Sequence, residues 1–207
     1  IKPPFPAVSG LWANPTVVNN VETIAAVPWI VNNSGADYAK IGIGRSTGTK
    51  LISASGHIKN PGVYEIEMGL SVYEFMNSDE YLGGMSSDRP LKAFIPGGSS
   101  VPVLPAHLIY KTANNEDRLM TYESLSDGGF ATGSMLGSGG FIVYDDTSCI
   151  VRNTWNFSRF YHHESCGQCS PCREGTGWME KVLHRIENGH GREEDIDLLL
   201  SIQSKIE

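Results

Sequence analysis

The chain has 207 residues, 40% hydrophobic and 19% charged, which is enough apolar material for one large packed core or two small ones. Its formal net charge of −7 argues against a nucleic-acid binder, which would need a basic face. Because no apolar run approaches the length of a bilayer crossing, we expect no direct membrane span, and we expect no signal peptide.

The first 18 residues contain four prolines, and we expect an extended arm here because proline interrupts helices. Helical spacing of the apolar residues over about residues 21–35 predicts a helix, bent at Pro28. Asn19 is expected to cap this helix, with Glu22 three residues later completing a capping box. On residue chemistry alone, a cap is the simplest role for the pair Asn19–Asn20.

The apolar spacing becomes that of strands after Gly48. Residues 50–55 and 63–68 are predicted to pair as a β-hairpin, because Asn60-Pro61-Gly62 between them suits a tight turn. A hairpin needs further elements to cover its apolar face, so this segment predicts the start of a small domain.

A short helix and another strand follow the hairpin. Ser71 and Glu74 have the spacing of a capping box and predict a helix start. Residues 91–95 are predicted to form a further strand. This mixture of strands and a helix over residues 48–127 predicts a small β-grasp-like domain of the α+β class.

A glycine-rich segment covers residues 128–140. It suggests a phosphate loop, but it lacks G-K-S/T and does not lead into a helix, so a turn between strands is the better interpretation. A strand-like run then extends over residues 141–151. Cys149 lies in that run and is expected to be a small apolar thiol within a strand.

The most informative stretch is H-E-S-C-G-Q-C-S-P-C-R-E-G-T-G, in which Cys166, Cys169 and Cys172 are each separated by two residues. C-x2-C-x2-C is the leading run of a [4Fe–4S] site, whereas zinc sites more often pair two cysteines locally and find the others far away. The spacing therefore predicts a metal centre, with an iron–sulfur cluster favoured over zinc.

The fourth ligand is not evident. In the ferredoxin pattern it would follow at position 176, which is a threonine. Since the helical pattern at the end of the chain continues to Glu207 without a cap, we expect these residues to be part of a larger protein, with the missing ligand beyond residue 207.

Two helices are predicted after the cysteines, the first through Trp178 to Gly189 and the second over residues 193–207. They predict a helical bundle whose first helix begins right after the ligand loop, with its N-terminal dipole favouring an anionic cluster. Arg173 either tunes the cluster or forms a surface ion pair with Glu174 or Glu180. His162 and His163, which adjoin the loop, are expected to pack or cap.

The cysteine run, preceded by P-P-F-P-A-V-S-G-L-W and P-T-V-V-N-N-V-E-T, resembles the NADH-binding flavoprotein subunit of respiratory complex I. Diaphorase subunits of NAD-linked hydrogenases and formate dehydrogenases share this core. The resemblance covers the whole chain and implies three parts. Residues 1–47 would be the end of an FMN-binding α/β domain, 48–127 a β-grasp domain of the soluble-ligand-binding (SLBB) type, and 128–207 a helical-bundle iron–sulfur domain.

The resemblance also implies site residues and cofactors. Cys166, Cys169 and Cys172 would hold a [4Fe–4S] cluster. Three residues near the start of the first predicted helix would contact FMN: Asn19, Asn20 and Thr23. Positions that match the NADH side of the pocket are Lys2 and Phe5.

The implied function is that of the electron-input subunit of NADH:quinone oxidoreductase, in which NADH is oxidised through FMN and electrons pass to the cluster. The implied partners are a thioredoxin-like [2Fe–2S] subunit and a large iron–sulfur subunit, and the implied location is cytoplasmic and peripheral on the inner face of the membrane. Because the family's flavin and nucleotide loop would lie before residue 1, we expect these residues alone to be inactive.

Two alternatives remain open at this point. The chain could belong to the diaphorase subunit of an NAD-linked hydrogenase or formate dehydrogenase. It could also be a non-enzymatic binding or docking module with a structural zinc, since the sequence contains no constellation typical of a general acid, base or nucleophile.

Overall fold

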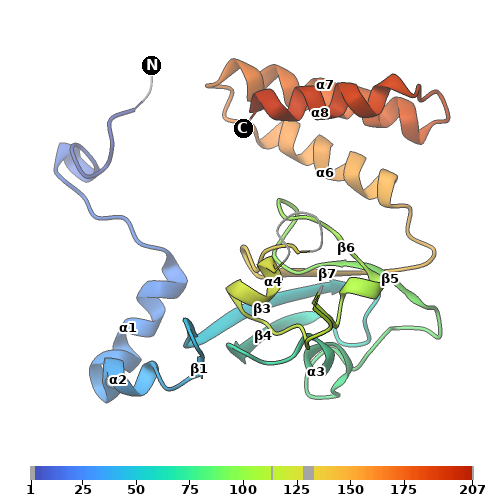
Figure 1. Cartoon of the computed structure of the whole chain (residues 1–207). Helices are drawn as coiled ribbons and strands as arrows, with labels where there is room; N and C mark the ends of the chain where they lie inside the picture. The colour runs from blue at the N-terminus through green and yellow to red at the C-terminus, as the bar shows by residue number, and fades with distance from the viewer. Residues whose placement is uncertain (1–2, 113, 128–132, 207) are drawn as a thin grey trace. The chain divides into compact units, whose positions relative to one another are not determined.

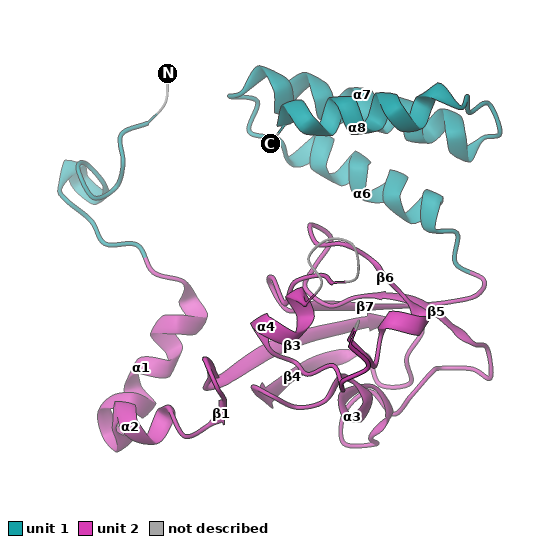
Figure 2. Ribbon diagram, in the orientation of Figure 1, with its two compact units in different colours: residues 1–18, 148–207 teal, residues 19–147 magenta. Residues whose placement is uncertain are grey.

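The computed structural model describes residues 3–112, 114–127 and 133–206. It contains two compact units, which Figure 2 colours separately: residues 19–147 form one, and residues 1–18 with 148–207 form the other. The first unit carries a mixed sheet and the second carries three long helices (Figure 1). The chain thus mixes α-helices and β-strands, as the sequence predicted in outline.

The segment before the sheet contains a short 3₁₀ turn, η1 (Leu11–Ala13), and two helices, α1 (Val21–Asn33) and α2 (Gly35–Tyr38). The prediction that Asn19 caps α1 is wrong by one residue. Asn20 has the extended backbone of a cap, and its Oδ1 accepts from the backbone N–H of Glu22 at 2.8 Å.

The larger sheet has five strands in the order β4-β3-β7-β5-β6. Their bounds are β3 Thr49–Gly56, β4 Gly62–Glu67, β5 Leu91–Ile95, β6 Leu104–Pro105 and β7 Gly140–Asp145. The predicted hairpin is confirmed as the antiparallel pair β3–β4, and the predicted strand over 91–95 is β5. β3 and β7 run parallel, whereas β5 pairs antiparallel with both β6 and β7. A separate two-stranded ribbon joins β1 (Gly42–Ile43) to β2 (Ser46–Thr47).

One helix, α3 (Val72–Asn77), fills the core of the sheet unit. Its predicted cap is confirmed, since Ser71 Oγ accepts from the N–H of Glu74 at 3.0 Å. Phe75 is fully buried and meets the ring of Phe141 on β7 edge-on, with 5.2 Å between centroids. Residues from β3, β4, β5, β7 and α3 therefore share one hydrophobic core.

A buried arginine organises the segment between β6 and β7, which contains η2 (Ala106–Leu108) and α4 (Tyr122–Ser126). Arg118 is 0% exposed, and its guanidinium donates to the backbone carbonyls of Leu108, Lys111 and Ser124. Burial lowers the pKa of Arg118. The N–H groups of the guanidinium thus give these backbone carbonyls the hydrogen bonds that a helix or a sheet would otherwise supply.

The sheet unit extends beyond the predicted boundary at residue 127, because β7 is a central strand and the unit ends at Thr147. Part of the glycine-rich turn predicted before β7, residues 128–132, lies outside the described residues. The strand predicted over 141–151 is too long. β7 ends at Asp145, whose Oδ1 accepts from Thr147 N at 3.0 Å in a turn that stops the strand.

Cys149 is consequently not a thiol within a strand. It is the N-cap of α6 (Ile150–Glu164), a helix that the sequence interpretation missed, and its sulfur accepts from the N–H of Arg152 at 3.5 Å. The side chain is exposed.

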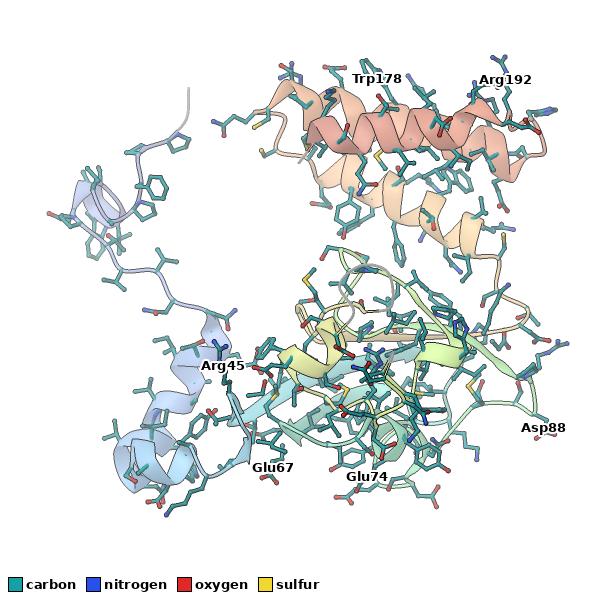
Figure 3. The ribbon with its side chains drawn as sticks, viewed as in Figure 1. Arg45, Glu67, Glu74, Asp88, Trp178 and Arg192 are labelled. Atoms are coloured by element: carbon teal, nitrogen blue, oxygen red, sulfur yellow. The ribbon has the colours of Figure 1, made fainter. Side chains whose placement is uncertain are left out.

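The other two helices of this unit are α7 (Ser170–Glu187) and α8 (Glu194–Ile206), both of them predicted. Gly189 has a φ of +76° just after α7 ends, as expected for a helix-terminating glycine. Val182 and Leu183 are buried, whereas Trp178 is 55% exposed and lies on the outer side of α7 (Figure 3).

Two glycines allow α7 to approach both of its neighbours. A Cβ on Gly175 would lie 3.0 Å from a side-chain atom of Ile206 on α8. A Cβ on Gly177 would lie 3.0 Å from the imidazole of His162 on α6. Both positions are buried, so the small residues are where the three helices meet.

Candidate functional site

The predicted cluster ligands lie on the loop between α6 and α7 and on the first turn of α7. Cys166 and Cys169 are exposed and Cys172 is half-buried, and none of them forms a disulfide. The helix begins at Ser170, earlier than predicted, so Cys169 is its N-cap and Cys172 lies within it. The sulfur of Cys169 forms no capping hydrogen bond, which leaves it available as a ligand.

The donor set fits an iron–sulfur cluster in its chemistry: three free thiols on a seven-residue segment that ends at a helix N-terminus. The structure does not bring the three sulfurs together. Among residues 3–112, 114–127 and 133–206, no three histidine, cysteine or acidic side chains converge closely enough to hold a metal ion. The assignment of these cysteines as ligands therefore stays a prediction.

Ser165 gives the loop a polar contact with the sulfur of one predicted ligand, Cys172. Its Oγ lies 3.4 Å from Cys172 Sγ and also accepts from the N–H of Gly167 at 3.3 Å. Gly167 has a φ of +71°, a conformation that glycine adopts without steric cost. The hydroxyl thus ties the loop to the first turn of α7.

Arg173 also contacts the backbone of this loop. Its Nη1 donates to the carbonyl of Gly167 at 2.8 Å, and its Nε donates to Glu174 at 3.0 Å. Of the two roles considered for Arg173, the ion pair with Glu174 is present, and the guanidinium also holds the loop backbone.

The neighbouring histidines both form contacts with carboxylates. His162 Nδ1 lies 2.7 Å from Glu180 Oε2, which joins α6 to α7. His163 Nδ1 lies 3.2 Å from Glu164 Oε1, at the end of α6.

The predicted flavin residues lie together at the start of α1. Asn19, Asn20 and Thr23 are all exposed. Since Asn20 Oδ1 accepts from Glu22 N, the amide nitrogen of Asn20 is left to donate to a ligand. Exposed polar groups of this kind fit a flavin, which offers carbonyl and phosphate acceptors.

Two further residues, Lys2 and Phe5, were predicted for the NADH side of the pocket. Phe5 is 69% exposed and belongs to the other unit, and Lys2 lies outside the described residues.

Sequence reasoning missed the partners of Glu22, for which it offered only a capping role. The Glu22 carboxylate contacts the sheet, accepting from the N–H of Leu51 at 2.7 Å and from Lys50 Nζ at 3.3 Å. No local sequence signal predicts contacts across nearly thirty residues; only the tertiary structure reveals them.

Comparison with known proteins places these observations in a family. Residues 152–207, which include all three clustered cysteines, match the family described as the NADH-ubiquinone oxidoreductase-F iron–sulfur binding region. This segment therefore resembles a family that is named for binding an iron–sulfur group.

Relatives match over the rest of the chain as well. The F 2 subunit of NADH-quinone oxidoreductase in Rhizobium meliloti is 48% identical over 202 residues, which cover 96% of this chain and 44% of the relative. The F subunit of NADH-quinone oxidoreductase in Mycobacterium bovis is 44% identical over 206 residues, 100% of this chain and 43% of the relative. The chain is a relative of the F subunits of NADH-quinone oxidoreductase, as its motifs predicted, and it spans less than half the length of these proteins.

The chain is also similar to solved structures. The NAD+-reducing [NiFe]-hydrogenase in the H2-reduced state contains a chain that is 32% identical, with a TM-score of 0.77 over 97% of this chain and 31% of that one. In the air-oxidised state the TM-score is 0.78 at 31% identity. Within the described residues, no helix is long and apolar enough to cross a membrane.

Proposed function

We propose that the chain is part of the electron-input subunit of an NADH:quinone oxidoreductase, which oxidises NADH through FMN and passes the electrons to a [4Fe–4S] cluster. The observation that carries this proposal is the group of three free, solvent-accessible thiols at the N-terminus of α7, inside the segment that matches an iron–sulfur binding family. Identities of 44–48% to the F subunits of such enzymes support the same conclusion.

In this proposal residues 1–47 are the end of an FMN-binding α/β domain. Residues 48–127, with β7 added, are a β-grasp domain, and the remaining residues are the cluster domain. The five-stranded sheet packed around α3 supports the middle assignment, and the three-helix arrangement of α6, α7 and α8 supports the last.

The residues of the chain would bind and orient the cofactors. Cys166, Cys169 and Cys172 would supply three thiolates, and Ser165 would donate to the sulfur of Cys172. Asn20 would donate its amide N–H to the flavin. When bound, the flavin and the cluster would supply the hydride and one-electron chemistry.

The proposed partners are a thioredoxin-like [2Fe–2S] subunit and a large iron–sulfur subunit, in a complex peripheral on the cytoplasmic face of the membrane. Support comes from the relatives, which are named as subunits of an oxidoreductase.

A second candidate is the diaphorase subunit of an NAD-linked hydrogenase, which the TM-score of 0.77 to such an enzyme favours. The lower identity, 32% against 44–48%, makes it the weaker of the two. Both candidates share the half-reaction at FMN and differ in the partner.

The cluster assignment is tested by Cys169→Ala, with Cys149→Ala as the matched control, in the protein at the full length of its relatives. We expect the control to keep about four irons per chain and the EPR signal of a reduced cluster. Cys169→Ala should lose both. Retained iron and an unchanged signal in Cys169→Ala would overturn the assignment, and one tightly held zinc in the unaltered protein would indicate the docking module instead.

A further inference from the structure

Glu22 connects helix α1 to the edge of strand β3, two elements that Figure 2 shows in the same unit. One oxygen of its carboxylate accepts from the backbone N–H of Leu51 at 2.7 Å. The other lies 3.3 Å from Lys50 Nζ. A single side chain thus contacts two consecutive residues of the sheet.

The sheet leaves both of these groups in need of a partner. β7 pairs with β3 only from Ser53 onward, so the N–H of Leu51 lies beyond the paired stretch. Lys50 is at a core-facing position of β3, with its side chain only 11% exposed. A largely buried ammonium and an open backbone donor are both costly without an acceptor, and Glu22 supplies one to each.

The same residue is linked to the predicted flavin contacts. Its backbone N–H donates to Asn20 Oδ1 at 2.8 Å, and Thr23 is the next residue in α1. Glu22, Thr23 and Lys50 also line a cleft of about 250 Å³ between α1 and the sheet. The position of Asn20 and Thr23 relative to the sheet therefore depends on the contacts of Glu22.

We propose that Glu22 is a positioning residue for the flavin: by its contacts with Lys50 and Leu51, it fixes the start of α1 on the sheet, and so places Asn20 and Thr23 for FMN. This inference rests on the proposed function, because it takes these two residues as flavin contacts. Glu22 itself need not touch the flavin.

The test compares four variants of the full-length holoprotein: Glu22→Ala, Glu22→Gln, Lys50→Met and the control Glu65→Gln. Glu65 accepts from Thr49 Oγ1 at 2.7 Å across β3 and β4, so the control removes a similar contact of β3 that does not involve α1. The measurements are the Kd for FMN by fluorescence titration, the midpoint potential of the bound flavin, and the EPR signal of the cluster.

Glu22→Ala should raise the Kd for FMN by about tenfold or more, equivalent to about 1.4 kcal/mol. Glu22→Gln should raise it less, because an amide oxygen can still accept from Leu51 N although the charge opposite Lys50 is lost. Lys50→Met should resemble Glu22→Gln, and both should shift the flavin potential. Glu65→Gln and the cluster signal should not change.

The possible outcomes distinguish the role of Glu22 in positioning the flavin from the proposed function, FMN binding, on which that role rests. An unaltered protein that binds no FMN overturns the proposed function. An unaltered protein that binds FMN, with the same Kd and potential in Glu22→Gln and Lys50→Met, overturns the inference. Since these two variants preserve the size of the side chains, they decide the question even if Glu22→Ala fails to fold.

Discussion

At the scale of single residues, the hydroxyl of Ser165 is placed to affect the cluster, because it lies 3.4 Å from Cys172 Sγ. A hydrogen bond to a cluster sulfur stabilises the reduced, more negative state. We expect Ser165→Ala to lower the reduction potential by roughly 40 mV, if the bond contributes about 1 kcal/mol to a one-electron couple. A redox titration followed by EPR measures this shift.

Ser170→Ala is the matched control for this prediction. Ser170 Oγ accepts from Arg173 Nη2 at 3.2 Å, so the control removes a hydroxyl of the same loop whose contact is with a guanidinium. Equal potentials in Ser165→Ala and the unaltered protein would show that the hydroxyl does not donate to the sulfur.

Residue chemistry reveals some of these positions in the sequence and not others. The three cysteines stand out as predicted ligands because their spacing is local and specific. The cap of α1 was placed on Asn19 because both asparagines have the right chemistry, and backbone geometry selects Asn20. The contacts of Glu22 with Lys50 and Leu51 depend on how a helix packs on a sheet, which no short pattern encodes.

At the scale of elements, the junction of α7 and α8 depends on a buried carboxylate. Asp195 is 2% exposed. Its carboxylate oxygens both accept from Arg185, with Nε at 3.1 Å from Oδ2, and Oδ2 also accepts from Arg192 N at 2.9 Å. The hydrogen bonds from Arg185 lower the pKa of Asp195 below its usual value, and the backbone bond from Arg192 adds to this effect.

A lowered pKa in the folded state means that Asp195 stabilises the fold above the ordinary pKa of an aspartate, about 4. This stabilisation is lost as the pH falls through the lower, folded value. We therefore expect Asp195→Asn to lower the melting temperature at pH 7, with a difference from the unaltered protein that shrinks in acid. Thermal unfolding followed by far-UV circular dichroism at several pH values tests this.

Asp197→Asn is the control, because Asp197 is exposed on the same turn of α8. A melting temperature deficit for Asp195→Asn that stays constant from pH 7 into acid would contradict the explanation.

Elements were predicted where the apolar spacing was regular, as in the β3–β4 hairpin, α3 and α7. The longest element missed was α6, which was partly included in a strand because the apolar run of β7 is followed closely by Cys149, Ile150 and Val151. The turn at Asp145 and Thr147 ends the strand, and its signal is two polar side chains. In the sequence, two polar residues are too short a break to mark the end of a strand when apolar residues lie on both sides of them.

At the scale of the whole molecule, the hydrophobic core and the proposed ligands belong to different units. The buried cluster of apolar side chains lies within residues 19–147, and the three cysteines lie within 148–207. Removing iron with a chelator should therefore destabilise the helices α6, α7 and α8 more than the sheet, since metal binding stabilises the unit that supplies the ligands.

Differential scanning calorimetry with and without the chelator measures this effect. We expect a second, lower transition after iron removal, and hydrogen exchange should assign it to residues 148–206. Equal loss of exchange protection in β3 and in α7 would contradict the prediction.

The two glycines of α7 have a consequence for how a metal centre could be built here. Gly175 and Gly177 bring α8 and α6 against α7 within two turns of Cys172, and this cysteine lies in the first turn of the same helix. Cys166 precedes the helix, on a loop joined to it through Ser165 and Arg173. Cys172 is thus held in place by packed helices, so we expect binding of a cluster to adjust the loop that carries Cys166 more than the helix that carries Cys172.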